Sequence, residues 1–415
     1  IMTDNNENKV LNVPHLRFPK FSGEWEICKV SELLDFYSTN SLSWEQLEYG
    51  EKAMMNLHYG LIHVGLPTMV DLRRDKLPNV KEGNMPKNFE LCKEGDVAFA
   101  DASEDTNEVA KVIELFNLDN KDIVCGLHTI HGRDNKNKTI VGFKGYAFSS
   151  SAFHNQIRRI AQGTKIYSIS TKNFSECYVG IPSKAEQTKI ATLLRLIDER
   201  IATQNKIIEK LQSLIKGLND NIHKGIKGET VCFSDLGEAY SGLSGKGGDD
   251  FGYGEPFITY MNVYQNTYIS EKDYELVQIA PNEKQNSVQY GDALFTLSSE
   301  TPEEVGIGAV YLGNTQKLYL NSFCFGIHFY DERVLPQYLA HFISSSSFRR
   351  AIYPLAQGST RFNLQKNDFM KMKFLLPSLE KQGHIANTLD ALHCRLANEK
   401  SLTEQYILFL NSATL

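Results

Sequence analysis

Apolar residues recur in alternating steps of four and three through the middle of the chain. The series after Pro182 comprises Ile190, Leu194, Ile197, Ile201, Ile208, Leu211, Ile215, Leu218 and Ile222. Polar Gln204 fills the one missing place. This spacing is typical of a heptad seam on a helix. Ser183 with Glu186 resembles a capping box and Gly225 marks a stop, so we predict a helix of about 40 residues, roughly 60 Å long.

A second seam of the same kind follows Pro377-Ser378 near the C-terminal end. It comprises Ile385, Leu389, Leu392, Leu396, Tyr406 and Leu410. Its polar interruption, Glu399, has the same phase as Gln204. Each helix could pack on its own domain. Alternatively, the two helices pair with each other in antiparallel fashion, as a coiled coil related by a pseudo-twofold axis.

The two seams belong to a long internal repeat. Residues 149–202 align without a gap on residues 344–397, with 17 identities in 54 positions. Upstream, the segment 95–99 (GDVAF) resembles 291–295 (GDALF), and Ser31 to Tyr37 resembles Ser234 to Tyr240. A period near 200 residues indicates a duplicated domain rather than a solenoid.

The regions between the seams have strand character. Apolar runs at 139–143, 309–312 and 323–327 are bounded by Gly, Asn and Asp, and we expect strands there. Residues 131–138 and 242–254 are predicted to be long polar loops, where binding usually takes place. The expected fold class is α+β, with two repeated α/β domains joined by two long helices.

The predicted boundaries follow from these patterns. They are a polar N-terminal tail at 1–12, a first domain at 13–180, a central helix at 181–226, a second domain at 227–375 and a C-terminal helix at 376–415.

Composition limits the classes of protein that remain. Apolar residues make up 41% of the 415 residues, enough for two buried cores. No apolar run is long enough to cross a bilayer, and the polar start predicts no signal peptide. The seven cysteines are widely spaced, so we expect no disulfide framework or zinc site, and a reducing cytoplasm. The net charge of −6 disfavours a polybasic DNA coat but not a sequence reader.

Searches for catalytic motifs find none that is convincing. Residues 251–254 (FGYG) lack the strand and helix of a dinucleotide site, and 242–247 (GLSGKG) lack the spacing of a P-loop. His128 and His131 are spaced H-x-x-H without a nearby third ligand. We therefore expect no catalytic residue, no metal and no cofactor in this chain, and a binding subunit rather than a free-standing enzyme.

Taken together, several short motifs resemble the specificity (S) subunit of type I restriction–modification enzymes, over essentially the whole chain. They are 13–18 (VPHLRF) with 21–25 (FSGEW), the turns 161–164 (AQGT) and 356–361 (AQGSTR), and the helix starts 181–187 (IPSKAEQ) and 376–382 (LPSLEKQ). The second copy departs by having Lys381 where Glu is usual, which weakens its capping box.

The resemblance implies a non-catalytic subunit that recognises double-stranded DNA. Two target recognition domains each read one half of a bipartite asymmetric site. The helices set the spacer and dock two methyltransferase (M) subunits, which use S-adenosylmethionine for adenine methylation. Restriction (R) subunits, which use ATP and Mg²⁺, join the full complex, a defence against foreign DNA.

Candidate DNA contacts are the cations and amides of the expected loops and of the repeated Gln-Gly turns. They are Arg73, Arg74, Lys76, Arg133, Lys136, Lys138, Thr164 and Lys165 in the first half, and Lys246, Asn262, Thr360 and Arg361 in the second. The turns could instead be structural. The seam residues are expected to act through packing, spacing and partner docking.

Two alternatives remain open from the sequence. The chain could be an S-like recognition subunit of another DNA-modifying defence complex. It could also be a coiled-coil scaffold that does not bind DNA, which the loop cations disfavour.

Overall fold

The computed structural model describes residue 14 and residues 17–50 and 54–413. The chain divides into two compact units, Ile1–Asn205 with Ser401–Leu415, and Lys206–Lys400. Each unit therefore holds one globular domain and part of both long helices. The predicted tail at 1–12 and Val13, His15 and Leu16 of the opening motif lie outside the described residues.

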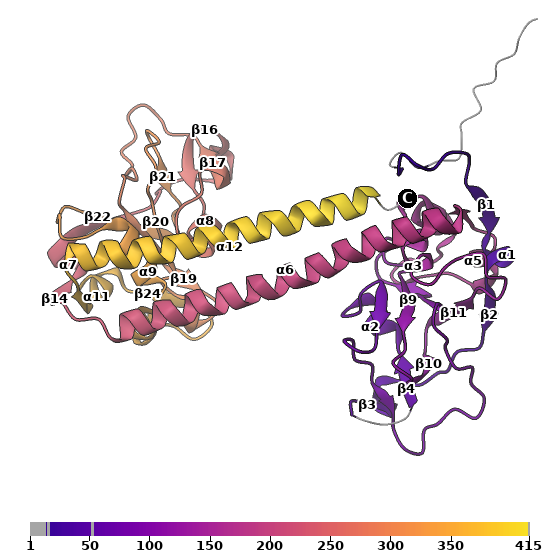
Figure 1. Ribbon diagram of the computed structural model, residues 1–415. Helices are drawn as coiled ribbons and strands as arrows, with labels where there is room; N and C mark the ends of the chain where they lie inside the picture. The colour runs from indigo at the N-terminus through magenta and orange to yellow at the C-terminus, as the bar shows by residue number, and fades with distance from the viewer. Residues whose placement is uncertain (1–13, 15–16, 51–53, 414–415) are drawn as a thin grey trace, which may run out of the picture. The chain divides into compact units, whose positions relative to one another are not determined.

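Both predicted long helices are present, each drawn as one uninterrupted ribbon (Figure 1). They are α6 (Lys184–Lys224) and α12 (Leu379–Ala413). The Ser183 hydroxyl accepts a hydrogen bond from the backbone N–H of Glu186 at 3.3 Å. The Glu186 carboxylate turns away to Arg17 and Trp25, so the predicted capping box forms only in part.

A five-stranded sheet in the order β2-β11-β7-β9-β5 forms the centre of the first domain. Its strands are β2 (Asp35–Tyr37), β5 (Met69–Asp71), β7 (Val97–Ala100), β9 (Val112–Asn117) and β11 (Thr129–Arg133). The middle strands are antiparallel, and β5 pairs in parallel with β9. Buried Phe99, Phe148, Phe153 and Phe174 pack edge to face beneath the sheet.

A second sheet, in the order β10-β4-β6-β3, extends the first domain. Its strands are β3 (Leu47–Glu48), β4 (Met54–Leu57), β6 (Asn79–Val80) and β10 (Asp122–Cys125). The remaining strands form two pairs, β1 (Glu26–Lys29) with β13 (Tyr178–Ile181), and β8 (Ala102–Ser103) with β12 (Tyr167–Ser168). The short helices are α1 (Val30–Leu33), α2 (Tyr59–His63), α3 (Lys144–Phe148), α4 (Ser151–Ile160) and α5 (Thr171–Ser175).

The second domain repeats the central framework in the order β15-β22-β18-β20. These strands are β15 (Gly237–Ser241), β18 (Ala293–Thr296), β20 (Gly308–Val310) and β22 (Cys324–Phe329). Further strands are β14 (Glu229–Cys232) with β25 (Lys373–Leu376), β16 (Phe251–Ile258) with β17 (Tyr274–Val277) and β21 (Tyr319–Leu320), and β19 (Ser298–Ser299) with β24 (Phe362–Leu364) and β23 (Ala356–Gln357). The helices are α7 (Phe233–Leu236), α8 (Tyr260–Gln265), α9 (Pro336–Ile343), α10 (Ser346–Ile352) and α11 (Lys366–Met370).

The strand registers show that the two domains share one framework. Ala98 pairs with His131 in the first sheet, and Leu294 pairs with Gly326 in the second. The short pairs β1-β13 and β14-β25 likewise correspond. The domains differ most in the sheets attached to this framework, β10-β4-β6-β3 in the first and β17-β16-β21 in the second.

Three details differ from the sequence predictions. Residues 139–143 form no strand but a turn before α3, because Glu114 accepts hydrogen bonds from the backbone of Gly142 and Gly145. The predicted loop at 131–138 begins inside β11, which continues to Arg133. The predicted loop at 242–254 ends in strand β16, which begins at Phe251. The strand expected at 323–327 is confirmed as β22.

Candidate nucleic-acid interface

The repeated Gln-Gly turn forms the tip of a hairpin in the first domain. The backbone N–H groups and carbonyls of Gln162 and Ser168 bond to each other at 2.8 and 2.9 Å. Gly163 between them has φ +145°, and a Cβ there would lie 1.9 Å from the carbonyl oxygen of Ile166. Glycine is therefore required at this position, because any side chain would collide with the returning strand.

The second domain builds the same hairpin from different tip residues. Gln357 pairs with Asn363, and Gly358 has φ +139°, where a Cβ would lie 2.1 Å from the carbonyl oxygen of Arg361. Thr164 and Lys165 are exposed at the first tip, and Thr360 and Arg361 at the second. These four candidates thus stand at corresponding exposed tips, where hydroxyls and cations can reach phosphate or base edges.

Three further candidates of the first domain lie together after β5. Arg73, Arg74 and Lys76 are exposed, and the guanidinium of Arg73 binds Asp71 at 2.9 Å through Nε. These hydrogen bonds lower the pKa of Asp71. Arg74 lies 3.6 Å from Glu199 on α6. The two arginines are exposed, and the carboxylates of Asp71 and Glu199 fix their orientation. We call Arg73, Arg74 and Lys76 the basic edge of the first domain.

Lys136 and Lys138 occupy the turn after β11. Lys136 is exposed, and its ammonium donates to the carbonyl of Glu32 at 2.8 Å. The ammonium of Lys138 donates to Glu26 at 2.7 Å and is less accessible. Surface pairs of this kind contribute little stability, so both lysines can exchange these partners for phosphate.

Arg133, by contrast, lies inside the first domain. Its guanidinium binds Asp96 at 2.8 and 2.9 Å, Glu90 at 2.6 Å and the carbonyl of Leu91 at 2.7 Å. The Tyr37 ring lies 4.3 Å from its Cζ. Because these contacts occupy the guanidinium, we remove Arg133 from the set of proposed DNA contacts.

Two candidates of the second domain are also used internally. Lys246 donates to Glu283 and to the carbonyl of Gln278. The hydrogen bonds that Glu283 accepts from Lys246 and Gln285 lower its pKa to about 2. Asn262 is buried, and its amide bonds to both backbone groups of Ser270. We remove both residues from the proposed set.

Four of the seam residues are buried where each long helix meets a domain. Ile190 and Leu194 belong to the first core, and Ile385 and Leu389 to the second. The other seam candidates, Ile197, Ile201, Ile208, Leu211, Leu392 and Leu396, are half-buried.

Sequence reasoning missed the contacts that tie each domain to its helix. Gln187 is fully buried and bonds to the backbone of Ile140, Lys138 and Pro182. Gln382 makes the same three kinds of bond to Leu335, Arg333 and Pro377. The repeated Gln was visible in the sequence, but two of its three partners lie 47 and 49 residues away.

A second missed contact exists only in the first unit. Arg17 binds both oxygens of the buried Glu186 at 2.7 and 2.8 Å, and Trp25 donates to the same carboxylate at 3.4 Å. Lys381 occupies the matching position in the second unit and is exposed. The three residues belong to motifs that the sequence showed separately.

No helix in the described part of the chain is both long and apolar enough to span a membrane.

The chain is similar in sequence to proteins of one known family. The type I restriction modification DNA specificity domain family matches residues 75–213 and 228–405. The specificity subunit of the type I restriction enzyme EcoKI from Escherichia coli (strain K12) is 25% identical over 279 residues. That match covers 60% of this chain and 58% of the relative, so this chain aligns with little more than half of the EcoKI subunit.

Two solved structures share the fold over nearly the whole length. One is the S subunit of a type I restriction–modification system from M. genitalium, with 13% identity, a TM-score of 0.54 and coverage of 94% of this chain and 95% of that one. The other is a structure described under complex assembly and conformational transition of the type I R-M system. It is 14% identical to this chain, has a TM-score of 0.57, and the match covers 94% of this chain and 96% of that one. Because the family matches both halves of the chain, the protein belongs to the type I restriction modification DNA specificity domain family.

Proposed function

We propose that this chain is the DNA-specificity subunit of a type I restriction–modification complex, and that each globular domain reads one half of a bipartite site. One observation carries the proposal. The two domains share a framework and the Gln-Gly hairpin, while the hairpin tips and the attached sheets differ. A shared scaffold with different exposed residues is suited to reading two different half-sites.

The proposed DNA contacts are the exposed members of the candidate set together with the half-buried Lys138. They are Thr164 and Lys165, Thr360 and Arg361, the basic edge of Arg73, Arg74 and Lys76, and the turn lysines Lys136 and Lys138. Lysine and threonine suit phosphate contacts, whereas arginine also suits guanine edges. A small, local set of cations is compatible with the net charge of −6.

The two long helices are proposed to pair in antiparallel fashion and to set the distance between the half-sites. Each core receives residues from both helices, which supports this arrangement. Leu410 of α12 packs on the first core beside Ile190 and Leu194 of α6, and Leu218 and Ile222 of α6 pack on the second core. In the second unit a pocket of about 290 Å³ is lined by Ile215 of α6 and Leu396 of α12.

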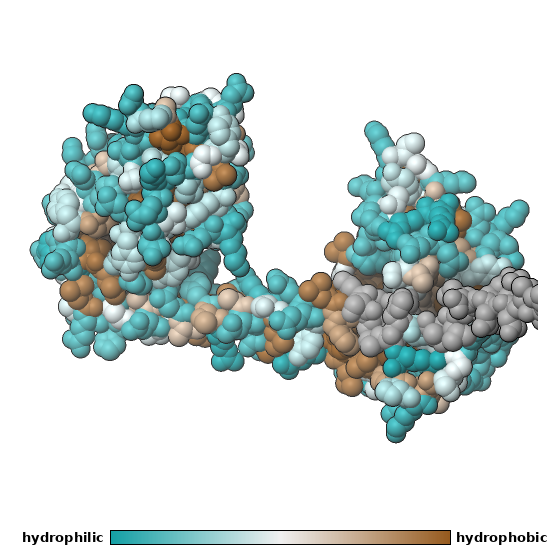
Figure 2. All heavy atoms as spheres, turned by 90° about the horizontal axis from the view of Figure 1, so that it is seen from above, coloured by the Kyte–Doolittle hydropathy of each residue, from teal (hydrophilic) through white to brown (hydrophobic). Residues whose placement is uncertain are grey.

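Methyltransferase subunits are the proposed partners of these helices. Figure 2 shows apolar residues exposed at several places on a mostly hydrophilic surface. Large apolar side chains exposed on the long helices are Leu196, Leu214, Leu379, Ile407, Leu408 and Phe409. Ile407, Leu408 and Phe409 are consecutive near the end of α12, and a group of exposed apolar side chains of this kind fits a protein partner. S-adenosylmethionine, ATP and Mg²⁺ then belong to the partner subunits, and this chain carries recognition without catalysis.

Co-expression with the cognate methyltransferase subunit, followed by modified-base sequencing of the host genome, tests the proposal. We expect adenine methylation in a bipartite motif that disappears without this chain. Arg361→Ala should weaken methylation through the second half-site, and Lys165→Ala through the first. Lys210→Ala, at an exposed position of α6, is the matched control and should leave the methylation unchanged. Absence of any methylation that depends on the chain would favour a scaffold without DNA binding.

A further inference from the structure

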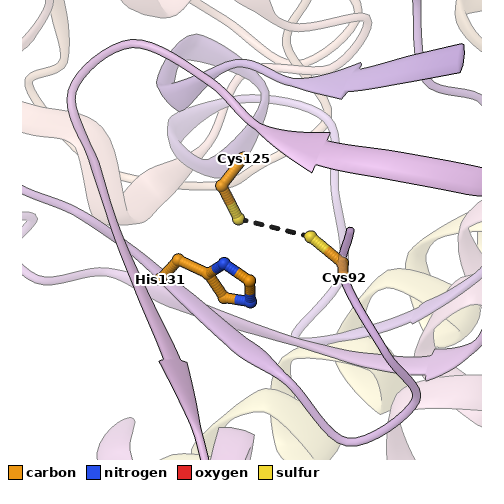
Figure 3. A group of neighbouring side chains, drawn as sticks. All are labelled: Cys92, Cys125 and His131. Carbon is orange, nitrogen blue, oxygen red and sulfur yellow. Dashed lines mark hydrogen bonds between the residues drawn. The ribbon is translucent and has the colours of Figure 1, made fainter. Parts of the chain in front are cut away.

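Two cysteines and one histidine meet inside the first domain. Figure 3 shows the side chains of Cys92, Cys125 and His131 converging on one point. Their ligand atoms all lie within 4.8 Å of one another, and all three residues are buried. The two sulfur atoms are 3.5 Å apart. Sequence spacing gave no sign of this cluster, because its members come from three separate segments.

The sulfur separation fits two ligands of one tetrahedral ion. Two thiolates at 2.3 Å from zinc in a tetrahedral arrangement lie about 3.8 Å apart. A disulfide would need about 2.05 Å, which is far shorter than the separation seen here. The two sulfur atoms therefore need to move apart by only about 0.3 Å to bind the same ion.

The histidine is oriented as metal-binding histidines usually are. Its Nε2 lies 2.7 Å from a carboxylate oxygen of Asp96, which is itself held by Arg133. That bond fixes the ring and leaves the lone pair on Nδ1, the nitrogen nearer to the sulfurs (Figure 3). Nδ1 is buried and has no hydrogen-bond partner among the described residues. A buried nitrogen without a partner is costly, and a metal ion would satisfy it.

The second domain provides an internal comparison. Gly326 occupies the position that corresponds to His131, as the strand registers show. There the hydroxyl of Tyr240 donates to one carboxylate oxygen of Asp292 at 2.7 Å, and Nδ1 of His328 lies 2.8 Å from the other, so Gly326 itself contributes no side chain to the aspartate. Among the residues that the structure describes, the ligand cluster of the first domain is the one group of its kind, so one site is expected in that part of the chain.

We propose that Cys92, Cys125 and His131 bind one divalent ion of the soft or borderline class, with Zn²⁺ as the best match. Two thiolates and an imidazole are the ligands that this class prefers. Two thiolates also neutralise a divalent ion, which makes its burial tolerable. One coordination position remains, and water fills it in sites with three protein ligands.

The proposed ion has a structural role. Cys125 ends β10 in the four-stranded sheet, His131 lies in β11 of the five-stranded sheet, and Cys92 lies in the segment that bridges to β10. An ion bound to all three would fix the two sheets of the first domain to each other. The inference does not depend on the proposed DNA function, and its test uses no DNA.

Cobalt titration of the reduced, metal-stripped full-length chain is the first test. We expect one equivalent of Co²⁺ to give a thiolate-to-cobalt charge-transfer band and the visible bands of a tetrahedral site. Cys92→Ser and His131→Gln should remove this spectrum, whereas Cys394→Ser, which changes an exposed thiol, should keep it. A spectrum absent from the wild type, or one lost only in the Cys394 variant, would refute the site.

Alkylation of the wild-type chain tests the site without any substitution. Zn²⁺ at about ten times its dissociation constant should slow alkylation of Cys92 and Cys125 by about tenfold. Cys177 is the matched control, since it is a buried thiol of the same unit, 5% exposed like Cys92. Equal rates with and without zinc would overturn the proposal. So would a Cys92–Cys125 disulfide in the purified chain combined with no uptake of metal.

Discussion

At the scale of single residues, the first domain contains a buried ion pair that its second copy lacks. Glu114 is fully buried 3.1 Å from the ammonium of Lys144, and burial raises the pKa of this carboxyl group. The strand registers place Val310 at the position that corresponds to Glu114. The framework therefore does not need the pair, but removal of one member should be costly.

We expect Lys144→Met to lower the free energy of unfolding by about 3–5 kcal/mol, because it leaves a carboxylate buried without its cation. Adding Glu114→Gln should recover much of this loss, since the amide is neutral and can still accept from Gly142 or Gly145. Urea denaturation of the single and double variants measures both effects. A double variant less stable than Lys144→Met alone would show that the charge is not the cause.

A second prediction at this scale concerns buried histidines of the second unit. His341 is 1% exposed, stacks on His393 at 5.5 Å and lies 2.8 Å from Asp390. Burial lowers the pKa of His341, of His393 and of the nearby His223, and it outweighs the opposing attraction of His341 to Asp390.

A lowered pKa means that the folded state prefers the neutral imidazole. The resulting stability is fully present above the unfolded value near 6.5 and is lost as the pH falls toward the folded value. We therefore expect the urea concentration at the denaturation midpoint of the second unit to decrease as the pH is lowered from 7 to 5. His341→Gln should flatten this dependence, whereas the exposed His384→Gln should keep it. Identical slopes in the two variants would contradict the assignment.

Residue-scale features were the least predictable from the sequence. A basic residue in a polar stretch of sequence can have either an exposed or a buried side chain. Arg133 is an interior residue whose guanidinium binds Asp96. The Cys92, Cys125 and His131 cluster depends on two sheets meeting, which no local spacing encodes. The Gln-Gly tips were predictable because they occur twice, in the same place relative to the helix.

At the scale of elements, one buried glutamine joins each long helix to its domain. Gln187 accepts from the backbone of Ile140, and Gln382 accepts from that of Leu335. Both amides also donate to two carbonyls each. This repeated contact explains why the same residue stands at both helix starts.

We expect Gln187→Ala and Gln382→Ala each to destabilise its own unit by about 1–3 kcal/mol, because buried backbone groups lose their partners. Hydrogen exchange should report the effect locally, at Ile140 in one variant and at Leu335 in the other. Gln212→Ala, at an exposed position of α6, is the control and should change stability little. Equal exchange at both sites in either variant would argue against two separate contacts.

The long helices were predictable because a heptad seam is a local pattern that repeats many times. Strands were harder. Residues 139–143 begin with three β-branched residues, Thr139, Ile140 and Val141, but Gly142 takes a positive φ of +92° and the segment forms a turn held by Glu114. Here a tertiary contact overrides the local preference.

At the scale of the whole molecule, the proposed function assigns the helices a measurable role. If they pair as a rigid spacer, their length determines the separation of the half-sites. One added heptad lengthens a helix by about 10 Å, which corresponds to about 3 base pairs of B-DNA at 3.4 Å each. The insertion belongs between Asn205 and Lys206 in α6 and between Lys400 and Ser401 in α12, where the two compact units divide.

Insertion of one heptad in both helices should lengthen the unread spacer by about 3 base pairs and leave both half-sites unchanged, because neither core nor hairpin tip is altered. Modified-base sequencing after co-expression with the methyltransferase subunit reads this directly. Insertion in α6 alone is the control and should abolish methylation, since the two seams then lose their register. Altered half-sites with an unchanged spacer would contradict the role of the helices, because recognition and spacing would then not reside in separate parts of the chain.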